Sequence, residues 1–254
     1  MACIVIDVGN TSTSLGRWEN REVTGIQAIN GGIKNPAAVE AALMAAGADR
    51  ADSAIIASVV PAVNPTWVWL LKRLFNLDLQ ILTYQTPMPV GIDYPKPEQI
   101  GADRLADAAG AYVRHGAPVI VADFGTALTF DVVDLDGNYT GGVIAPGLPL
   151  MTHYLHEKTA QLPLVDLRGD FPSRGDSTEN AMKIGAKLGH RGMVREIAEY
   201  IKAFTGPDTV LCATGGYAEW ALGGLSMDFI IEPDLTLFGL GVIHDFGEGE
   251  GVRF

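Results

Sequence analysis

The strongest constraint on the fold is a pattern that occurs twice in the 254 residues of the chain. A β-branched apolar run ends in an Asp-x-Gly turn with small polar residues at Ile6–Ser14, and again at Val119–Thr129. Nearly continuous apolar residues are typical of a strand that is covered on both faces. The pattern therefore predicts buried strands at residues 3–8 and 119–122, each ending in a polar turn.

A hairpin is expected after each turn, because alternating residues run from Ser14 to Trp18 and from Thr129 to Leu135 before further turn residues. Helical and extended segments then alternate in both halves of the chain. We expect helices at 36–47, 67–75, 148–159, 179–204 and 217–222, strands at 54–60, 79–82, 209–213 and 229–231, and a frayed tail at 247–251. The fold class is therefore α/β, with two related lobes at residues 1–115 and 116–254 whose polar turns face a shared cleft.

Composition and charge limit the classes of partner. Hydrophobic residues make up 48% of the chain and charged residues 19%, which is enough apolar material for a sizeable core. A formal net charge of -12, without a run of Lys and Arg, disfavours nucleic acid as a partner. The short apolar start ends at Asp7 and follows no basic segment, so neither a secretory signal nor a membrane span is expected. Cys3 and Cys212 lie in or beside apolar runs, which favours two buried thiols in the reducing cytoplasm.

The two polar turns have the chemistry of a phosphate site. Each combines a carboxylate at the end of a strand with a glycine and hydroxyl side chains. Backbone N–H groups and hydroxyls bind phosphoryl oxygens, whereas the aspartate repels them unless a cation lies between. The turns therefore predict a nucleoside triphosphate bound with Mg²⁺, which the aspartate holds through water. Alternatively, both are ordinary strand-ending turns with local hydrogen bonds, and their duplication favours phosphate binding.

Gly101-Ala102-Asp103-Arg104 stands where helical spacing begins, at or just inside a helix start. Asp103 suits a base that accepts a proton from a substrate hydroxyl, and Arg104 suits a substrate carboxylate. Equally, Asp103 is a first-turn charge matched to the helix dipole and Arg104 a surface cation. A strand also enters a turn at Gly215-Gly216, where paired glycines let a flat ring or a ribose approach the main chain, although Gly-Gly is also a routine turn.

Five motifs occur in order along the chain: Asp7–Thr11, Gly101–Arg104, Asp123–Ala127, Gly141–Gly147 and Thr214–Gly216. Together they resemble those of the type III pantothenate kinases, a family of the acetate and sugar kinase, Hsp70 and actin superfamily. The resemblance spans nearly the whole chain, since residues 58–61, 159–163 and 234–240 also fit. It implies two related actin-like (ribonuclease H-like) lobes with an ATP cleft between them. The implied activity is ATP-dependent phosphorylation of pantothenate to 4'-phosphopantothenate, the first step of coenzyme A biosynthesis.

The resemblance also implies cofactors, partners and residue roles. The family uses ATP with Mg²⁺, needs K⁺ or NH₄⁺, and is usually homodimeric; a cytoplasmic location without membrane or nucleic acid partners fits it. The implied ATP-binding residues are Asp7, Val8, Gly9, Asn10, Thr11, Ser12, Thr13, Ser14, Thr126, Gly215 and Gly216. The implied pantothenate-binding residues are Tyr94, Gly101, Ala102, Asp103, Arg104 and Thr178. The resemblance implies that Asp103 accepts the proton and that Asp123 is the K⁺ ligand. It implies that Asp7 holds Mg²⁺, either directly or through water.

The chain departs from the family's pattern around Thr178, at Ser177 and Ile184. Two other functions stay open on the sequence alone. One is a non-catalytic regulatory or accessory relative, and retention of the acidic site residues favours the enzyme. The other is a kinase for another small hydroxy acid or sugar. Tyr94 and Gly101–Arg104 disfavour this alternative, because the resemblance implies that they bind pantothenate.

Overall fold

The computed structural model describes residues 1–30, 33, 35–167 and 170–249, and the chain forms two compact units. The first unit contains Met1–Ala117, Val133–Gly141 and the chain from Asp234 onward, and the second contains Pro118–Val132 and Gly142–Pro233. Two β-sheets with associated helices confirm the expected α/β class. The division into two related lobes at residues 1–115 and 116–254 stays a prediction. It is inferred from the repeated sequence pattern, whereas the two units are defined by contacts between residues.

The first sheet has the strand order β3-β2-β1-β4-β5. Its strands are β1 (Cys3–Val8), β2 (Ser12–Glu19), β3 (Glu22–Asn30), β4 (Ser53–Ser58) and β5 (Leu79–Ile81). β1, β2 and β3 pair antiparallel, and β4 and β5 add parallel strands beside β1. Asn20 and Arg21 make the tight turn between β2 and β3, with φ angles of 53° and 64° in the left-handed region. The first expected hairpin is therefore confirmed.

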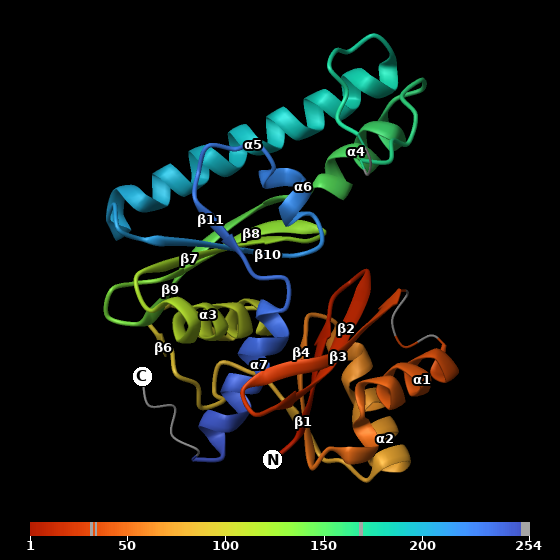
Figure 1. Cartoon of the computed structure of the whole chain (residues 1–254), viewed down its shortest axis with the longest axis vertical. Helices are drawn as coiled ribbons and strands as arrows, with labels where there is room; N and C mark the ends of the chain where they lie inside the picture. The colour runs from red at the N-terminus through yellow and green to blue at the C-terminus, as the bar shows by residue number, and fades with distance from the viewer. Residues whose placement is uncertain (31–32, 34, 168–169, 250–254) are drawn as a thin grey trace. The chain divides into compact units, whose positions relative to one another are not determined.

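Helices cover both faces of this sheet (Figure 1). They are α1 (Pro36–Ala46), α2 (Asn64–Phe75), α3 (Ala102–His115) and α7 (Leu235–Gly247). α1 and α2 pack on the face that presents Ile4 and Ile6, in a core with Leu43 and Trp67. α7 contacts β1, β2 and β4 and also packs along α3. β1 is apolar on both faces because helices cover it on both sides.

Small residues let α3 and α7 approach each other closely. A Cβ on Gly239 of α7 would overlap the carbonyl oxygen of Ala106 in α3. At one end of the crossing, the Arg114 guanidinium donates two hydrogen bonds to the Asp234 carboxylate, over 2.9 and 3.0 Å. Near the C-terminal end of α7, the indole N–H of Trp18 in β2 donates to Asp245 over 2.9 Å. These contacts hold the C-terminal helix to the first unit.

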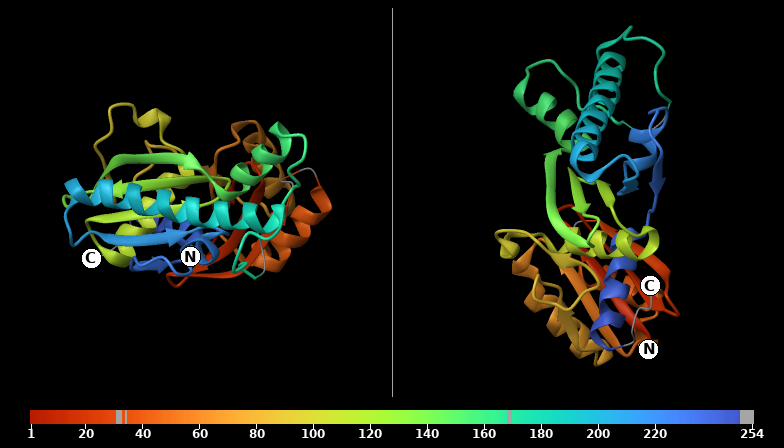
Figure 2. Two further views of the ribbon diagram at one scale, coloured as in Figure 1. Left: turned by 90° about the horizontal axis from the view of Figure 1, so that it is seen from above. Right: turned by 90° about the vertical axis from the view of Figure 1, so that its left-hand side faces the viewer.

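The second sheet has the strand order β11-β10-β7-β8-β9-β6. Its strands are β6 (Gly91–Ile92), β7 (Val119–Phe124), β8 (Ala127–Val133), β9 (Asn138–Pro146), β10 (Val210–Thr214) and β11 (Phe229–Ile231). The remaining helices are α4 (Leu148–Lys158), α5 (Thr178–Thr205), α6 (Ala218–Leu222) and the short 3-10 helices η2 (Ala48–Arg50), η3 (Pro61–Val63) and η4 (Pro97–Gln99). β7, β8 and β10 share an apolar core with α5 and α6, and α5 runs along one face of these strands (Figure 2).

Every helix and strand expected from the sequence is present, with ends that differ by a few residues. α7 and the two-residue strand β6 have no counterpart among the expected elements. Gly247, the first residue of the expected tail, closes α7, and residues 250–251 of that tail lie outside the described residues. Local periodicity therefore predicts most elements of this chain.

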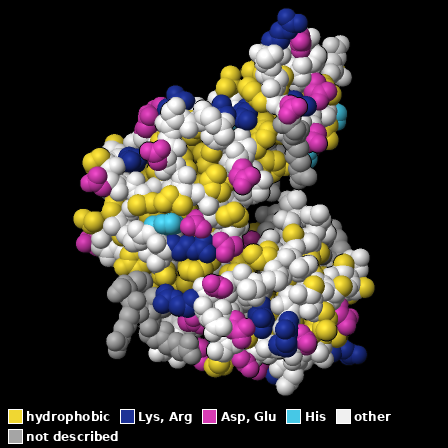
Figure 3. All heavy atoms as spheres, viewed as in Figure 1, with side chains coloured by type: hydrophobic (Ala, Val, Ile, Leu, Met, Phe, Trp, Pro, Cys, Tyr) yellow, Lys and Arg dark blue, Asp and Glu magenta, His cyan; other side chains and the backbone are white. Residues whose placement is uncertain are grey.

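On the face shown in Figure 3, Lys and Arg side chains are scattered and adjoin Asp and Glu. Such mixing gives no continuous cationic surface on that face. Within the described ranges, no helix combines the length and the apolar character that a membrane crossing requires.

Candidate functional site

The first polar turn joins β1 to β2 and exposes a row of amide and hydroxyl side chains. The N–H of Gly9 donates to the Ser12 carbonyl oxygen over 3.0 Å, which closes the turn. Asn10, Thr11 and Ser12 are exposed, and Asp7 is half-buried near the end of β1. Main-chain N–H groups and exposed hydroxyls are the groups that bind phosphoryl oxygens. The turn has the chemistry that the sequence predicts for it.

Two of the predicted ATP-binding side chains point inward. Val8 and Thr13 are 4% and 0% exposed, and Thr13 Oγ1 has no hydrogen-bond partner within the described part of the chain. Since side chains alternate along a strand, Thr13 shares the buried face of β2 with Leu15. Val8 and Thr13 therefore present main-chain atoms, not side chains, to any ligand of this turn.

Gly101 caps α3, and the next three residues form its first turn. The N–H of Arg104 donates to Asp103 Oδ1 over 2.8 Å, while Ala102 is buried beneath them. Burial raises the pKa of the Asp103 carboxyl above its ordinary value, although the N–H and guanidinium of Arg104 oppose that rise. A carboxylate with a raised pKa is a stronger base, which suits proton acceptance.

Tyr94 and Arg104 meet at one aromatic ring. Tyr94 packs edge-on against Tyr139, with ring centroids 6.1 Å apart. The Arg104 guanidinium carbon lies 5.8 Å from the centroid of the same Tyr139 ring. The structure thus brings Tyr94 together with Gly101–Arg104 in the first unit. Sequence reasoning missed Tyr139, whose only signal is that of an apolar residue in a hairpin.

The second polar turn, between β7 and β8, lies against glycines of the second unit. A Cβ on Gly215, whose φ is 90°, would overlap the Asp123 carboxylate. A Cβ on Gly147 would overlap the Thr126 carbonyl oxygen, whereas the Cβ position of Gly216 is open. The structure therefore brings Asp123, Thr126 and Gly215 together, because Gly215 and Gly147 have no side chains that would prevent this close packing, and of the three glycines only Gly216 leaves open space beside them.

His190 of α5 lies in contact with Phe124, the residue after Asp123. The two rings meet edge to face with centroids 5.7 Å apart, and His190 is 1% exposed. Burial lowers the pKa of His190 to about 4. The imidazole is therefore uncharged near neutral pH and adds no cation beside the second turn.

Thr178 is the first residue of α5 and is exposed in the second unit. Ser177, one of the two departures from the family's pattern, is the N-cap of this helix. Its Oγ accepts a hydrogen bond from the Asn180 N–H over 3.1 Å. Such a cap stabilises a helix by about 1 kcal/mol relative to alanine. The departure at Ser177 thus has a structural role, and Ile184 is half-buried within α5.

The acidic residues are compatible with Mg²⁺ but do not form a closed metal cage. In the ranges that the structure describes, no three His, Cys, Asp or Glu side chains cluster as metal ligands. Mg²⁺ usually binds one or two carboxylates and fills its other positions with water and phosphate oxygens. A single carboxylate such as Asp7 at a phosphate turn fits that donor set.

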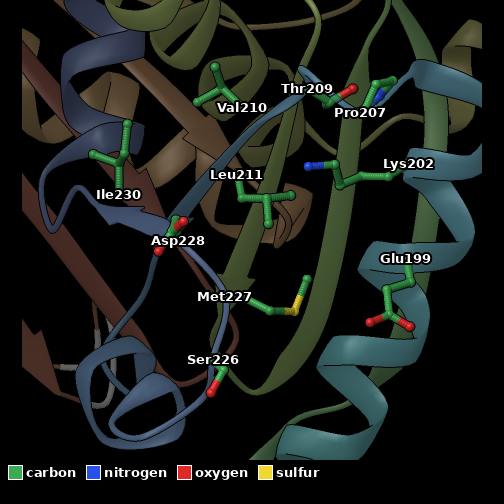
Figure 4. A pocket seen from close by; sticks show the side chains of 10 residues that line it. All are labelled: Glu199, Lys202, Pro207, Thr209, Val210, Leu211, Ser226, Met227, Asp228 and Ile230. Atoms are coloured by element: carbon green, nitrogen blue, oxygen red, sulfur yellow. The ribbon is translucent and has the colours of Figure 1, made fainter.

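A separate pocket of about 830 Å³ lies between α5 and the strands β10 and β11 (Figure 4). Charged Glu199, Lys202 and Asp228 line it together with apolar Leu211 and Met227. None of the predicted site residues is part of this lining.

The predicted site residues form two groups. The first unit holds Asp7–Ser14, Tyr94 and Gly101–Arg104, and the second holds Asp123, Thr126, Thr178, Gly215 and Gly216. Convergence of both groups on one nucleotide stays a prediction.

Comparisons with known proteins agree on one family. The sequence profile described as type III pantothenate kinase matches residues 3–200. The type III pantothenate kinase of Akkermansia muciniphila is 44% identical over 191 residues, which are 75% of this chain and 77% of that protein. The type III pantothenate kinase of Methylacidiphilum infernorum is 38% identical over 248 residues, 95% of this chain and 88% of that protein.

A solved structure is similar in fold. A ROK family glucokinase from Streptomyces griseus has a TM-score of 0.56 and 13% identity, with 98% of this chain and 100% of the glucokinase covered. At this identity the likeness concerns the fold alone, and it confirms the expected actin-like α/β class. The profile and the two relatives cover most of the chain, and they show that it belongs to the type III pantothenate kinase family.

Proposed function

We propose that this enzyme phosphorylates pantothenate with ATP, and that Asp103 accepts the proton of the attacking hydroxyl. Family membership supports the reaction. One observation supports Asp103 as the base: its carboxyl lies at the start of α3, and burial raises the pKa of that carboxyl. In the transfer, the hydroxyl oxygen forms a bond to the γ-phosphorus, the bond from that phosphorus to the bridging oxygen of ADP breaks, and the proton passes to Asp103.

The site must recognise pantothenate at two ends, the hydroxyl that attacks ATP and the carboxylate. The planar guanidinium of Arg104 binds the carboxylate through paired hydrogen bonds, and Tyr94 forms an adjacent wall. Thr178 of α5 adds a hydroxyl contact. With the acceptor held in this way, the hydroxyl lies in line with the γ-phosphorus, and this alignment supplies much of the acceleration.

The nucleotide side uses the two polar turns. Asp7–Ser14 and Thr126 bind phosphate oxygens, and Gly215-Gly216 lie beside the adenosine. Asp7 holds Mg²⁺ through water, and the bound metal would neutralise charge on the phosphates. Asp123 binds K⁺ or NH₄⁺, with support from the close packing of Gly215 on its carboxylate.

A coupled assay of ADP release across a panel of acceptors tests this function. We expect turnover with pantothenate and Mg²⁺-ATP, and little with glucose, glycerate or acetate. Replacement of K⁺ by Na⁺ is expected to raise the KM for ATP. Faster turnover of another acceptor would overturn the pantothenate assignment, whereas indifference to K⁺ would remove only the role of Asp123.

We further propose a homodimer that forms through α5, and a cytoplasmic location. Ala181, Gly185, Leu188 and Gly189 are exposed and recur at helical spacing on α5. The Cβ positions of Gly185, Gly189 and Gly192 meet no atom within 4 Å in the described chain. Small residues on one helix face allow another helix to approach closely. The thiols of Cys3 and Cys212 are both buried, which is consistent with a reducing compartment.

Gly189→Arg tests the dimer, because it adds a long charged side chain to this face. Arginine is a better helix former than glycine, so α5 itself is not weakened. Light scattering is expected to report a dimer for the wild type and a monomer for Gly189→Arg. Glu40→Arg, which adds the same side chain at an exposed position of α1, is the control and is expected to stay dimeric. A monomeric wild type, or a dimeric Gly189→Arg variant, contradicts the proposed interface.

A further inference from the structure

We propose that Tyr139 is a positioning residue for Tyr94 and Arg104, and that Gly141 preserves the space that the Tyr94 ring occupies. The inference rests on the proposed function for the identity of the substrate. Its contacts all lie within the first unit. Tyr139 and Gly141 are buried near the start of β9, and alternate residues of a strand face the same side. They would form a rigid support behind two side chains that touch pantothenate.

The main chain of β9 holds the segment that carries Tyr94. The two residues of β6 pair in parallel with the first two residues of β9. Just beyond β6, the N–H of Asp93 donates to the carbonyl oxygen of Tyr139 over 3.0 Å. Tyr94 is the next residue. The backbone of Tyr139 therefore determines where the Tyr94 side chain leaves the sheet.

The Tyr94 ring is then held from two sides. Tyr139 meets it edge-on, at an interplanar angle of 70° and a centroid separation of 6.1 Å. At Gly141, a Cβ would lie 3.2 Å from Tyr94 Cε2, which is tighter than ordinary contact. Gly141 also has a φ of 126°, a conformation that favours glycine. A larger residue at position 141 would displace the ring, so glycine is the residue that fits.

The Tyr139 ring also receives the guanidinium of Arg104. The 5.8 Å separation lies within the range of a cation–π contact. The ring is fully buried, so water competes little for this attraction. Arg104 has a long side chain with many rotamers, and a fixed contact on its guanidinium reduces the freedom lost when a carboxylate binds. Tyr139 thus couples the two pantothenate-binding side chains through a single ring.

Tyr139→Leu tests the inference, since leucine is apolar but lacks the aromatic ring. We expect the KM for pantothenate to rise about tenfold, the scale of losing one cation–π contact in a desolvated site. The KM for ATP is expected to stay near the wild-type value, and kcat is expected to fall less than the pantothenate KM rises. Tyr139→Phe keeps the ring and is expected to retain a KM for pantothenate close to that of the wild type.

Phe238→Leu is the matched control for lost packing. Phe238 is a buried aromatic of α7 that contacts Trp18 and Arg114, away from the Tyr139 ring contacts. It is expected to lower the melting temperature without raising the pantothenate KM. An unchanged pantothenate KM in Tyr139→Leu, or an equal rise in both KM values, overturns the inference.

Arg104→Lys separates this inference from the proposed function. If Arg104→Lys leaves the pantothenate KM unchanged, the substrate role of Arg104 fails, and the positioning role fails with it. If Arg104→Lys raises the pantothenate KM but Tyr139→Leu does not, only the positioning role of Tyr139 fails. When both roles hold, Tyr139→Leu is expected to add less to the KM in the Arg104→Lys background than in the wild type, because the two changes affect one contact.

Discussion

Asp103→Asn is expected to lower kcat by about 10²–10⁴-fold, the usual cost of removing a general base. The amide is nearly isosteric with the carboxylate and can still accept the hydrogen bond from the Arg104 N–H, but it cannot take the hydroxyl proton. Binding of ATP is expected to be unchanged, as measured by titration calorimetry with Mg²⁺-ATP. An Asp103→Asn variant with the kcat of the wild type would exclude the base assignment.

The pH profile of the wild type gives a second measurement on the same residue. Burial raises the pKa of Asp103, so the carboxylate form is lost on acidification at a higher pH than for an exposed aspartate. The acidic limb of kcat/KM for pantothenate is therefore expected above the ordinary aspartate range. Glu98→Gln, an exposed carboxylate change just before α3, is the control and should leave that limb in place. A limb that stays within the ordinary range speaks against Asp103 as the titrating group.

Stability is expected to change in the opposite direction from activity. A carboxyl whose pKa is raised in the folded state binds its proton more tightly there than in the unfolded chain. Its contribution to stability is present below the ordinary pKa and is lost as the pH rises through the raised value. Asp103→Asn has no such pH dependence. Its melting temperature, relative to the wild type, is therefore expected to rise with pH across that window. A constant difference at all pH values would contradict the raised pKa.

Local signals were sufficient for most of the fold. The apolar runs at β1 and β7 are buried on both faces, and the turn residues after β2 and β8 end their hairpins where the sequence indicates. α7 is not predicted because its run from Leu235 contains glycines that weaken a helical prediction. Two of those glycines serve packing: Gly239 at the crossing with α3, and Gly241 against Trp18 of β2. β6 is not predicted because two residues are too few to show a periodic pattern. A helix whose glycines allow close packing, such as α7, is thus poorly predicted by helix propensity.

The candidate site divides in the same way. Asp103 and Arg104 follow from a helix start with chemically useful side chains, and the exposed tip at Asn10 and Thr11 follows from a polar turn. The inward direction of Thr13 also follows, from strand alternation with Leu15. The contacts of Tyr139 do not, because they join segments that are far apart in the sequence. A residue that supports others through tertiary contacts leaves no local signal.

Gly239→Ala is expected to destabilise the enzyme by about 2 kcal/mol or more, since the new methyl group overlaps the backbone of α3. The added Cβ would lie 2.6 Å from the Ala106 carbonyl carbon and 3.2 Å from the Gly110 nitrogen. Neither neighbour is a flexible side chain, so α3 and α7 must separate. Alanine gains about 1 kcal/mol over glycine in helix propensity, which is smaller than the usual 1–3 kcal/mol cost of overpacking plus the lost contacts of two displaced helices.

Gly247→Ala is the matched control, because it makes the same substitution in the same helix where the Cβ position meets no atom within 4 Å. Calorimetry is expected to show a melting temperature about 4–8 °C lower for Gly239→Ala and one equal to or above the wild type for Gly247→Ala. Since α3 carries Asp103 and Arg104 at its first turn, separation of the helices is also expected to raise the pantothenate KM of Gly239→Ala. If both variants melt at the same temperature, the α3–α7 crossing is not closely packed. The idea that α7 supports the start of α3 is then wrong.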